Sequence, residues 1–158
     1  MEELLQLKDY LLARNYEAAI SIVAELETMS RQDKINTLES YLTVLLIHLI
    51  KIQVEKRVTK SWLVSIRNSI YEIKRRNRLG KKSHYIKQGE WLEHFSEVIS
   101  EAIVDASQEI FCGINTKELR AKIDFELLQS QTLELLELSY SDLNSEEIKE
   151  YLEQKFSS

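Results

Sequence analysis

The feature that most constrains the fold is a shortage of turn-forming residues: the 158-residue chain has no proline and three glycines, Gly80, Gly89 and Gly113. A fold built from many strands needs many tight turns, and such turns draw mainly on glycine and proline. Apolar residues make up 44% of the chain and charged residues 30%, as is typical of a folded globular protein. The sequence therefore predicts an all-α fold, a compact bundle of about five to seven helices.

Helical periodicity divides the chain into segments. Apolar positions recur in steps of three and four from Ile35 to Ile52, which predicts a long apolar helix that begins near Ser30 and lies centrally in the bundle. Two shorter helices precede it, and a basic helix begins at Thr59 or Ser61. Gly80 is the predicted C-terminal cap of the basic helix. Further helices are predicted over 90–111, 116–138 and 145–156, the last with a capping box of Asn144 and Glu147 at its start. Gly113 separates a helical bundle domain, 1–113, from a C-terminal helical arm, 114–158, which we expect to pack on the same domain.

Cysteine usage and hydropathy suggest the compartment. The single cysteine, Cys112, cannot form an internal disulfide, which favours a reducing environment. Glu2 and Glu3 stand where a secretory leader would carry basic residues. The longest apolar run, 41–50, is interrupted by Thr43 and His48, whereas a membrane-spanning helix needs about 20 apolar residues. We therefore expect a cytoplasmic protein without a transmembrane segment.

Charge is unevenly distributed along the chain. Residues 51–87 carry 12 basic and 2 acidic side chains, whereas residues 88–158 carry 5 basic and 16 acidic ones. The predicted basic helix supplies six candidate contacts for phosphates or for an acidic partner: Lys60, Arg67, Lys74, Arg75, Arg76 and Arg78. Three interpretations stay open: pairing with acidic segments of this chain or of a second copy, binding of nucleic acid, and binding of anionic lipid or an acidic protein.

A histidine within the apolar helix is the most interesting single residue. His48 lies among leucines, and a buried imidazole needs a hydrogen-bond partner because leaving it unpaired costs about 1–3 kcal/mol. Trp62 and Arg67 on the next helix and Glu39 upstream complete a candidate group. This group predicts either a polar core that fixes helix packing or a pocket with a titratable histidine.

The sequence gives little support for a metal site, a phosphate-binding loop or a catalytic nucleophile. No two of His48, His84 and His94 are three or four residues apart, and no Glu-x-x-His motif is present, so neither a zinc nor a di-iron site is expected. No glycine-rich loop could hold a phosphate, and a single cysteine beside an aromatic residue is not an activated nucleophile. We therefore expect no catalytic residues, no metal site and no cofactor.

A family resemblance rests on the segment 38–73. It is carried by three groups of residues: Leu38-Glu39-Ser40, then Leu45-Leu46-Ile47-His48-Leu49-Ile50-Lys51, then Ser61-Trp62 with Ser65-Ile66-Arg67. The acidic segment 97–106 fits a later helix. Over about residues 4–109 the chain resembles the bacterial family catalogued as domain of unknown function 29. The resemblance implies a compact all-α bundle and no activity.

These observations favour an interaction role without catalysis. The predicted module binds an unknown protein or itself, as a homodimer, through the basic helix and the leucine-rich arm 114–158. One alternative is a nucleic-acid-binding protein that uses the basic helix 60–78. The other is a small-molecule or metal pocket near His48.

Overall fold

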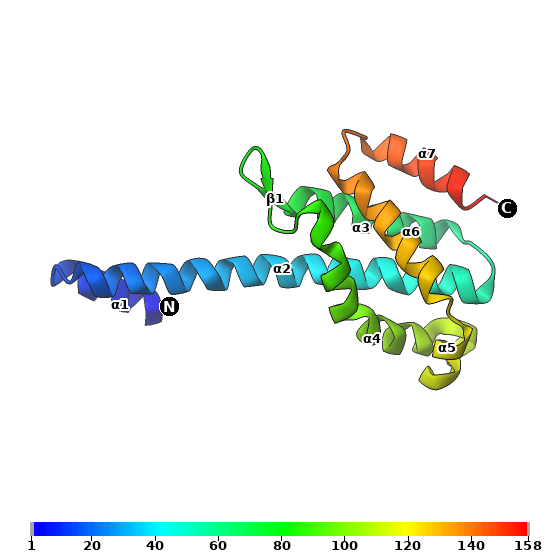
Figure 1. The fold of residues 1–158 in the computed structure, drawn as a ribbon, viewed down its shortest axis with the longest axis horizontal. Coiled ribbons are helices and arrows are strands. Elements are labelled where there is room, and N and C mark those ends of the chain that lie inside the picture. The colour runs from blue at the N-terminus through cyan, green and yellow to red at the C-terminus, as the bar shows by residue number, and fades with distance from the viewer. Residues whose placement is uncertain (1, 158) are drawn as a thin grey trace. The chain divides into compact units, whose positions relative to one another are not determined.

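Helices account for almost all regular structure in the computed structural model, which describes residues 2–157 (Figure 1). Over that range there are seven α-helices: α1 (Glu2–Leu12), α2 (Tyr16–Glu55), α3 (Lys60–Arg76), α4 (Trp91–Glu109), α5 (Thr116–Lys122), α6 (Phe125–Glu137) and α7 (Ser145–Lys155). Short 3-10 turns, η1 (Gln88–Glu90), η2 (Ile110–Cys112) and η3 (Leu138–Tyr140), extend or join them. The prediction of an all-α bundle is confirmed.

The chain divides into two compact units, Met1–Asn36 and Thr37–Ser158. In the first unit, α1 folds back along the beginning of α2 (Figure 1). The second unit contains the remainder of α2 and all later helices. The boundary after Gly113 that the sequence predicts lies inside this second unit, where α7 packs on α3 and both α5 and α6 contact α4. The division into a helical bundle domain, 1–113, and a C-terminal arm, 114–158, that packs on it stays a prediction.

The core of the second unit is centred on α2, as the strongly apolar pattern predicts. Five side chains of this helix are fully buried between positions 42 and 50: Leu42, Leu45, Leu46, Leu49 and Ile50. Helix α3 buries Ile66, Ile70 and Ile73, spaced by four and three residues, so that one face of the helix meets the core. Burying one such leucine or isoleucine stabilises the fold by about 1.5–3 kcal/mol.

Short polar side chains set where four helices begin. Thr59 Oγ1 accepts a hydrogen bond from the backbone N–H of Trp62 at the start of α3, and Asp124 does the same for Leu127 at the start of α6. Asn115 caps α5. Asn144 forms the predicted capping box, because its side chain bonds to the N–H of Glu147 and the Glu147 carboxylate bonds back. Such caps satisfy N–H groups that have no partner within the helix.

Two predicted helix boundaries are wrong. The sequence predicts a break near Ser30, whereas α2 continues unbroken because no glycine or proline interrupts it. The sequence also predicts one helix over 116–138, whereas the structure has a break between α5 and α6. The side chain of Gln53 stabilises this break: its Oε1 accepts from the N–H of Asp124 at 2.8 Å, and its Nε2 donates to the carbonyl of Asp124 at 3.1 Å.

The region after α3 differs from the predicted glycine cap. Helix α3 ends at Arg76 with Asn77 as its C-cap, and a hairpin of two short antiparallel strands follows, β1 (Arg78–Leu79) and β2 (Ser83–His84). Gly80 lies in the turn of this hairpin with φ +73°, a conformation that glycine adopts without strain. The buried side chain of Asn77 therefore ends the helix in place of Gly80.

Helix α2 is long and apolar enough, by length and composition alone, to cross a membrane. Its most apolar part is only partly buried within the protein. The core helix of a soluble protein has the same properties. The expected absence of a transmembrane segment stays a prediction.

Candidate functional site

The four residues of the predicted polar core lie in separate surroundings. His48 Nδ1 lies 2.8 Å from the backbone carbonyl of Val44 on its own helix. Glu39 lies nine residues earlier on α2, about 13 Å along the helix, and its carboxylate pairs with His94 Nδ1 at 2.8 Å. Neither Trp62 nor Arg67 supplies the hydrogen-bond partner of His48. The polar group that the sequence predicts around His48 is thus divided in two: His48 bonds within α2, whereas Glu39 pairs with His94 of α4.

Trp62 has two cations near its indole ring. Its indole ring is 8% exposed, with Lys51 Nζ at 5.4 Å and the Arg57 guanidinium carbon at 4.9 Å from a ring centroid. Lys51 is itself buried and forms an ion pair with Glu109 of α4 at 3.1 Å. Cation–π contacts and this ion pair compensate the cost of burying the ammonium group. Trp62 therefore connects α2 with the start of α3 and has a packing role.

Three of the six basic candidates contact groups of this chain. Lys74 Nζ donates to the carbonyls of Ser141 and Leu143 at 2.6 and 2.8 Å, which ties α3 to the segment before α7. Arg75 and Arg76 both bind the carboxylate of Glu72, at 3.2 and 2.7 Å. These two guanidinium groups hold the pKa of Glu72 below its ordinary value. The basic helix is therefore partly neutralised from within.

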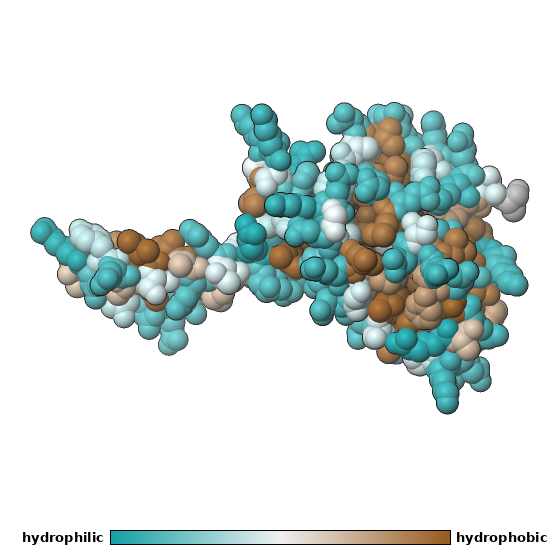
Figure 2. Space-filling view, viewed as in Figure 1, coloured by the Kyte–Doolittle hydropathy of each residue, from teal (hydrophilic) through white to brown (hydrophobic). Residues whose placement is uncertain are grey.

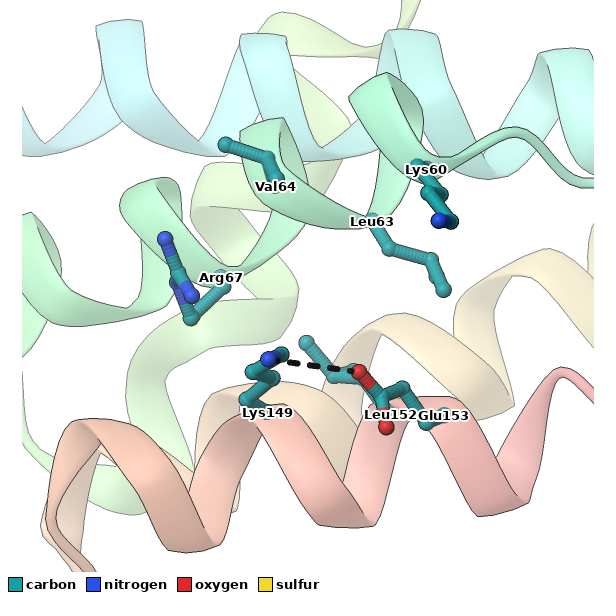
Figure 3. A pocket seen from close by; sticks show the side chains of 7 residues that line it. All are labelled: Lys60, Leu63, Val64, Arg67, Lys149, Leu152 and Glu153. Carbon is teal, nitrogen blue, oxygen red and sulfur yellow. Dashed lines mark ion pairs between the residues drawn. The ribbon is translucent and has the colours of Figure 1, made fainter.

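Lys60 and Arg67 are different, because within residues 2–157 neither has a carboxylate partner. Both line a groove of about 460 Å³ between α3 and α7 (Figure 3). The remaining lining residues are Leu63, Val64, Lys149, Leu152 and Glu153. Figure 3 shows the apolar side chains of Leu63 and Leu152 between the two helices, with the charged groups around them.

A second cavity, of about 720 Å³, adjoins this groove and shares Lys60, Leu63 and Glu153 with it. Together the two cavities are lined by six cations and one carboxylate; the cations are Lys56, Arg57, Lys60, Arg67, Lys149 and Lys155, and the carboxylate is Glu153. Apolar side chains, Leu63 and Phe156 among them, form part of the lining. We call this combined surface the basic groove. It suits a ligand that is both acidic and apolar.

Ion pairs arrange the α7 side of the basic groove. Lys149 and Glu153 form a pair four residues apart on α7 at 3.8 Å, and Lys155 binds Glu134 of α6 at 2.8 Å. The same carboxylate of Glu134 accepts a hydrogen bond from Tyr151, which raises the pKa of Tyr151 to about 12. Through Tyr151 and Lys155, Glu134 thus holds one face of α7 against α6. The face of α7 that carries Lys149 and Leu152 lines the groove with α3.

Sequence reasoning identified Lys60 and Arg67 but missed the α7 residues of the basic groove. The one local signal is the pair Lys149 and Glu153, whose spacing places both side chains on one face of a helix. Nothing in the sequence indicates that this face meets α3. The predicted candidate Arg78 lies outside the groove, in strand β1 of the hairpin.

His48 predicts a pH dependence of stability. Burial lowers the pKa of His48 below 6.5, and the neighbouring Lys51 lowers it further, whereas the Val44 carbonyl and Glu109 act in the opposite direction. The unfolded chain therefore takes up a proton near pH 6.5 that the folded chain takes up only at lower pH, so stability falls as the pH drops below about 6.5. We expect His48→Leu to lose less stability than the wild type between pH 7.5 and 5.5, measured by urea unfolding.

A control for this measurement is the interval from pH 7.5 to 9, where His48 is neutral in both states. Wild type and variant should change in parallel there. Equal losses of the two proteins between pH 7.5 and 5.5 would contradict the assignment of the transition to His48.

The fold and the groove together define an all-α protein with a cationic, partly apolar groove between two helices. Comparison with protein families places it more closely: the family described as "Domain of unknown function DUF29" matches residues 6–136, and the chain belongs to this family. The match continues well past Gly113, further than the resemblance over 4–109 indicates. No curated protein and no solved structure matches the chain. Helix α7, one wall of the basic groove, lies beyond the matched residues.

Proposed function

We propose that this protein is a cytoplasmic interaction module without catalytic activity, and that its basic groove binds an acidic amphipathic helix of a partner protein. The observation that carries the proposal is the groove itself, in which six cations and one carboxylate surround apolar side chains. An amphipathic helix that lies in a groove buries its apolar face and presents its charged edges to the rim. The acidic edges would meet Lys60 and Arg67. Because neither has a carboxylate partner within residues 2–157, no internal ion pair has to be broken before they bind the partner.

The apolar lining of the basic groove favours this proposal over nucleic-acid binding along 60–78. Three of the six basic candidates on that segment, Lys74, Arg75 and Arg76, are already engaged with groups of this chain. Internal pairing alone does not separate the two, because three of the six groove cations, Arg57, Lys149 and Lys155, also form ion pairs within the chain. A phosphate backbone gains little from apolar side chains such as Leu63 and Leu152, whereas an amphipathic helix gains from burying against them. A small-molecule pocket at His48 has less support, because the imidazole bonds to its own helix.

A designed peptide tests the proposal directly. The probe is a labelled peptide of about 15 residues, roughly 22 Å as a helix, with leucine on one face and glutamate on its flanks. We expect it to bind the wild-type protein, and we expect the double variant Lys60→Glu/Arg67→Glu to bind at least about tenfold more weakly, a change of about 1.4 kcal/mol. Fluorescence anisotropy gives both affinities.

Two controls make the result specific. Lys117→Glu reverses an exposed cation on α5 outside the groove and should leave the affinity unchanged. A peptide of the same composition in scrambled order should bind weakly, because it has no continuous apolar face. Equal affinity for the two peptides, or stronger binding of a short DNA duplex than of the designed peptide, would overturn the proposal.

A further inference from the structure

The first unit exposes far more apolar surface than its size explains. Eight of the sixteen large hydrophobic side chains exposed in residues 2–157 lie before residue 30, in less than a quarter of the chain. They are Leu4, Leu5, Leu11, Leu12, Tyr16, Ile20, Val23 and Met29. Figure 2 shows hydrophobic side chains at the surface of this helical hairpin.

The hairpin also lacks a core of its own. Among residues 2–36, Ala19 is the only buried side chain. Structures of fewer than about 40 residues cannot bury enough apolar surface alone and usually need a disulfide, a metal or association with another chain. The only cysteine, Cys112, lies outside this unit, and no three metal-binding side chains gather within residues 2–157. Association is the remaining means of stabilising the hairpin.

We propose that the hairpin 2–36 is a self-association surface on which the same hairpin of a second copy packs, so that two copies form an antiparallel four-helix bundle. The spacing of the exposed residues fits this arrangement. Leu4 and Leu11 recur after seven residues on α1, as do Leu5 and Leu12, and such repeats form the seams along which bundled helices pack.

The available area matches that of a stable dimer. A standard interface buries about 800 Å² on each partner. Eight large side chains that are 40–73% exposed supply apolar surface of that order. Because two-fold symmetry presents the same patch on both copies, an apolar surface of this kind is self-complementary without a second, different binding site.

Charge selects the antiparallel orientation. Residues 1–36 carry seven acidic and four basic side chains. Because α1 folds back along the beginning of α2 (Figure 1), Glu2 and Glu3 at the start of α1 lie near Glu25 and Glu27 of α2. The charged residues around the turn, Lys8, Asp9, Arg14 and Glu17, carry no net charge. A parallel pair would bring the two acidic ends together. An antiparallel pair places the turn of each copy beside the acidic end of the other.

The test is the oligomeric state of the full chain, measured by sedimentation equilibrium. The wild-type protein should be a dimer of about twice the 18.6 kDa chain mass. Leu12→Glu/Ile20→Glu places charges on the two most exposed apolar side chains of the hairpin and should raise the dimer dissociation constant at least about 100-fold. These positions are 73% and 69% exposed, so the substitutions leave the monomer fold intact, which circular dichroism checks.

Leu92→Glu is the matched control, because Leu92 is an exposed leucine on α4 in the second unit. This variant should dimerise like the wild type. A wild-type protein that is monomeric at high micromolar concentration would overturn the proposal and leave the hairpin to a different partner. A dimer that withstands Leu12→Glu/Ile20→Glu but is lost in Leu92→Glu would place the interface in the second unit instead.

Discussion

Asn77→Ala should lower the free energy of unfolding by about 3 kcal/mol, because it removes a buried polar contact and leaves a cavity. The side chain of Asn77 is 1% exposed. Its Oδ1 accepts from the backbone N–H of Ile86 at 2.8 Å, and its Nδ2 donates to the Ile86 carbonyl at 2.9 Å. Alanine leaves that N–H buried without a partner, which alone costs about 1–3 kcal/mol.

Asn77 belongs to a network that joins three parts of the second unit. Tyr140 of η3 donates to the Ile86 carbonyl at 2.6 Å, and its oxygen accepts from Trp91 Nε1 at 2.6 Å and from Asn77 Nδ2 at 3.2 Å. A tyrosine hydroxyl keeps its proton at neutral pH and can therefore donate, and burial raises the pKa of Tyr140 further. The end of α3, the segment before α4 and η3 are thus held by one set of hydrogen bonds.

Urea unfolding of two further variants tests whether the effect of Asn77→Ala comes from the loss of this network. Asn68→Ala removes an exposed asparagine from the same helix and should change the free energy of unfolding by less than about 0.5 kcal/mol. Tyr140→Phe should be destabilising, and its effect should not add to that of Asn77→Ala because the two side chains share partners. A loss below about 1 kcal/mol in Asn77→Ala would contradict the role of this network.

Leu46→Ala should have an effect of similar size by a different mechanism. Leu46 is fully buried in the middle of the apolar part of α2. Removing a buried leucine loses its transfer free energy and leaves a cavity that the core fills only partly, which costs about 2–5 kcal/mol. We therefore expect a loss of about 3 kcal/mol in the free energy of unfolding, measured by thermal or urea denaturation.

Val44→Ala is the matched control for Leu46→Ala, because Val44 lies two residues away on the same helix and is 37% exposed. Its loss should be below about 1 kcal/mol. Similar losses in the two variants would mean that α2 is not packed on one side as the structure has it.

Much of the helical architecture could be predicted from the sequence, because helix formation depends on local patterns. The apolar spacing before Ile52 predicts the central helix, and the capping box of Asn144 and Glu147 marks the start of α7. Boundaries were less predictable. The break between α5 and α6 is stabilised by Gln53, a residue some 70 positions earlier, which no local pattern reveals.

The candidate site, too, could be predicted from the sequence only in part. Lys60 and Arg67 stand out as cations on a helix from the sequence alone, but so do Lys74, Arg75 and Arg76. Only the fold separates the two sets, because it places the carbonyls before α7 against Lys74 and leaves Lys60 and Arg67 beside a groove, without a carboxylate partner among residues 2–157. Likewise, the composition of residues 2–36 predicts helices, whereas their exposure becomes visible only in the structure.

The sequence by itself determined the all-α class, the family and most helices, because these follow from short-range spacing, capping and the scarcity of turn residues. The tertiary structure alone decided which cations stay unpaired, that α7 forms the second wall of the basic groove, and that Asn77 closes α3. These features depend on contacts between residues far apart in the chain. Such contacts depend on how helices pack side by side, and spacing within a single helix does not specify its neighbour.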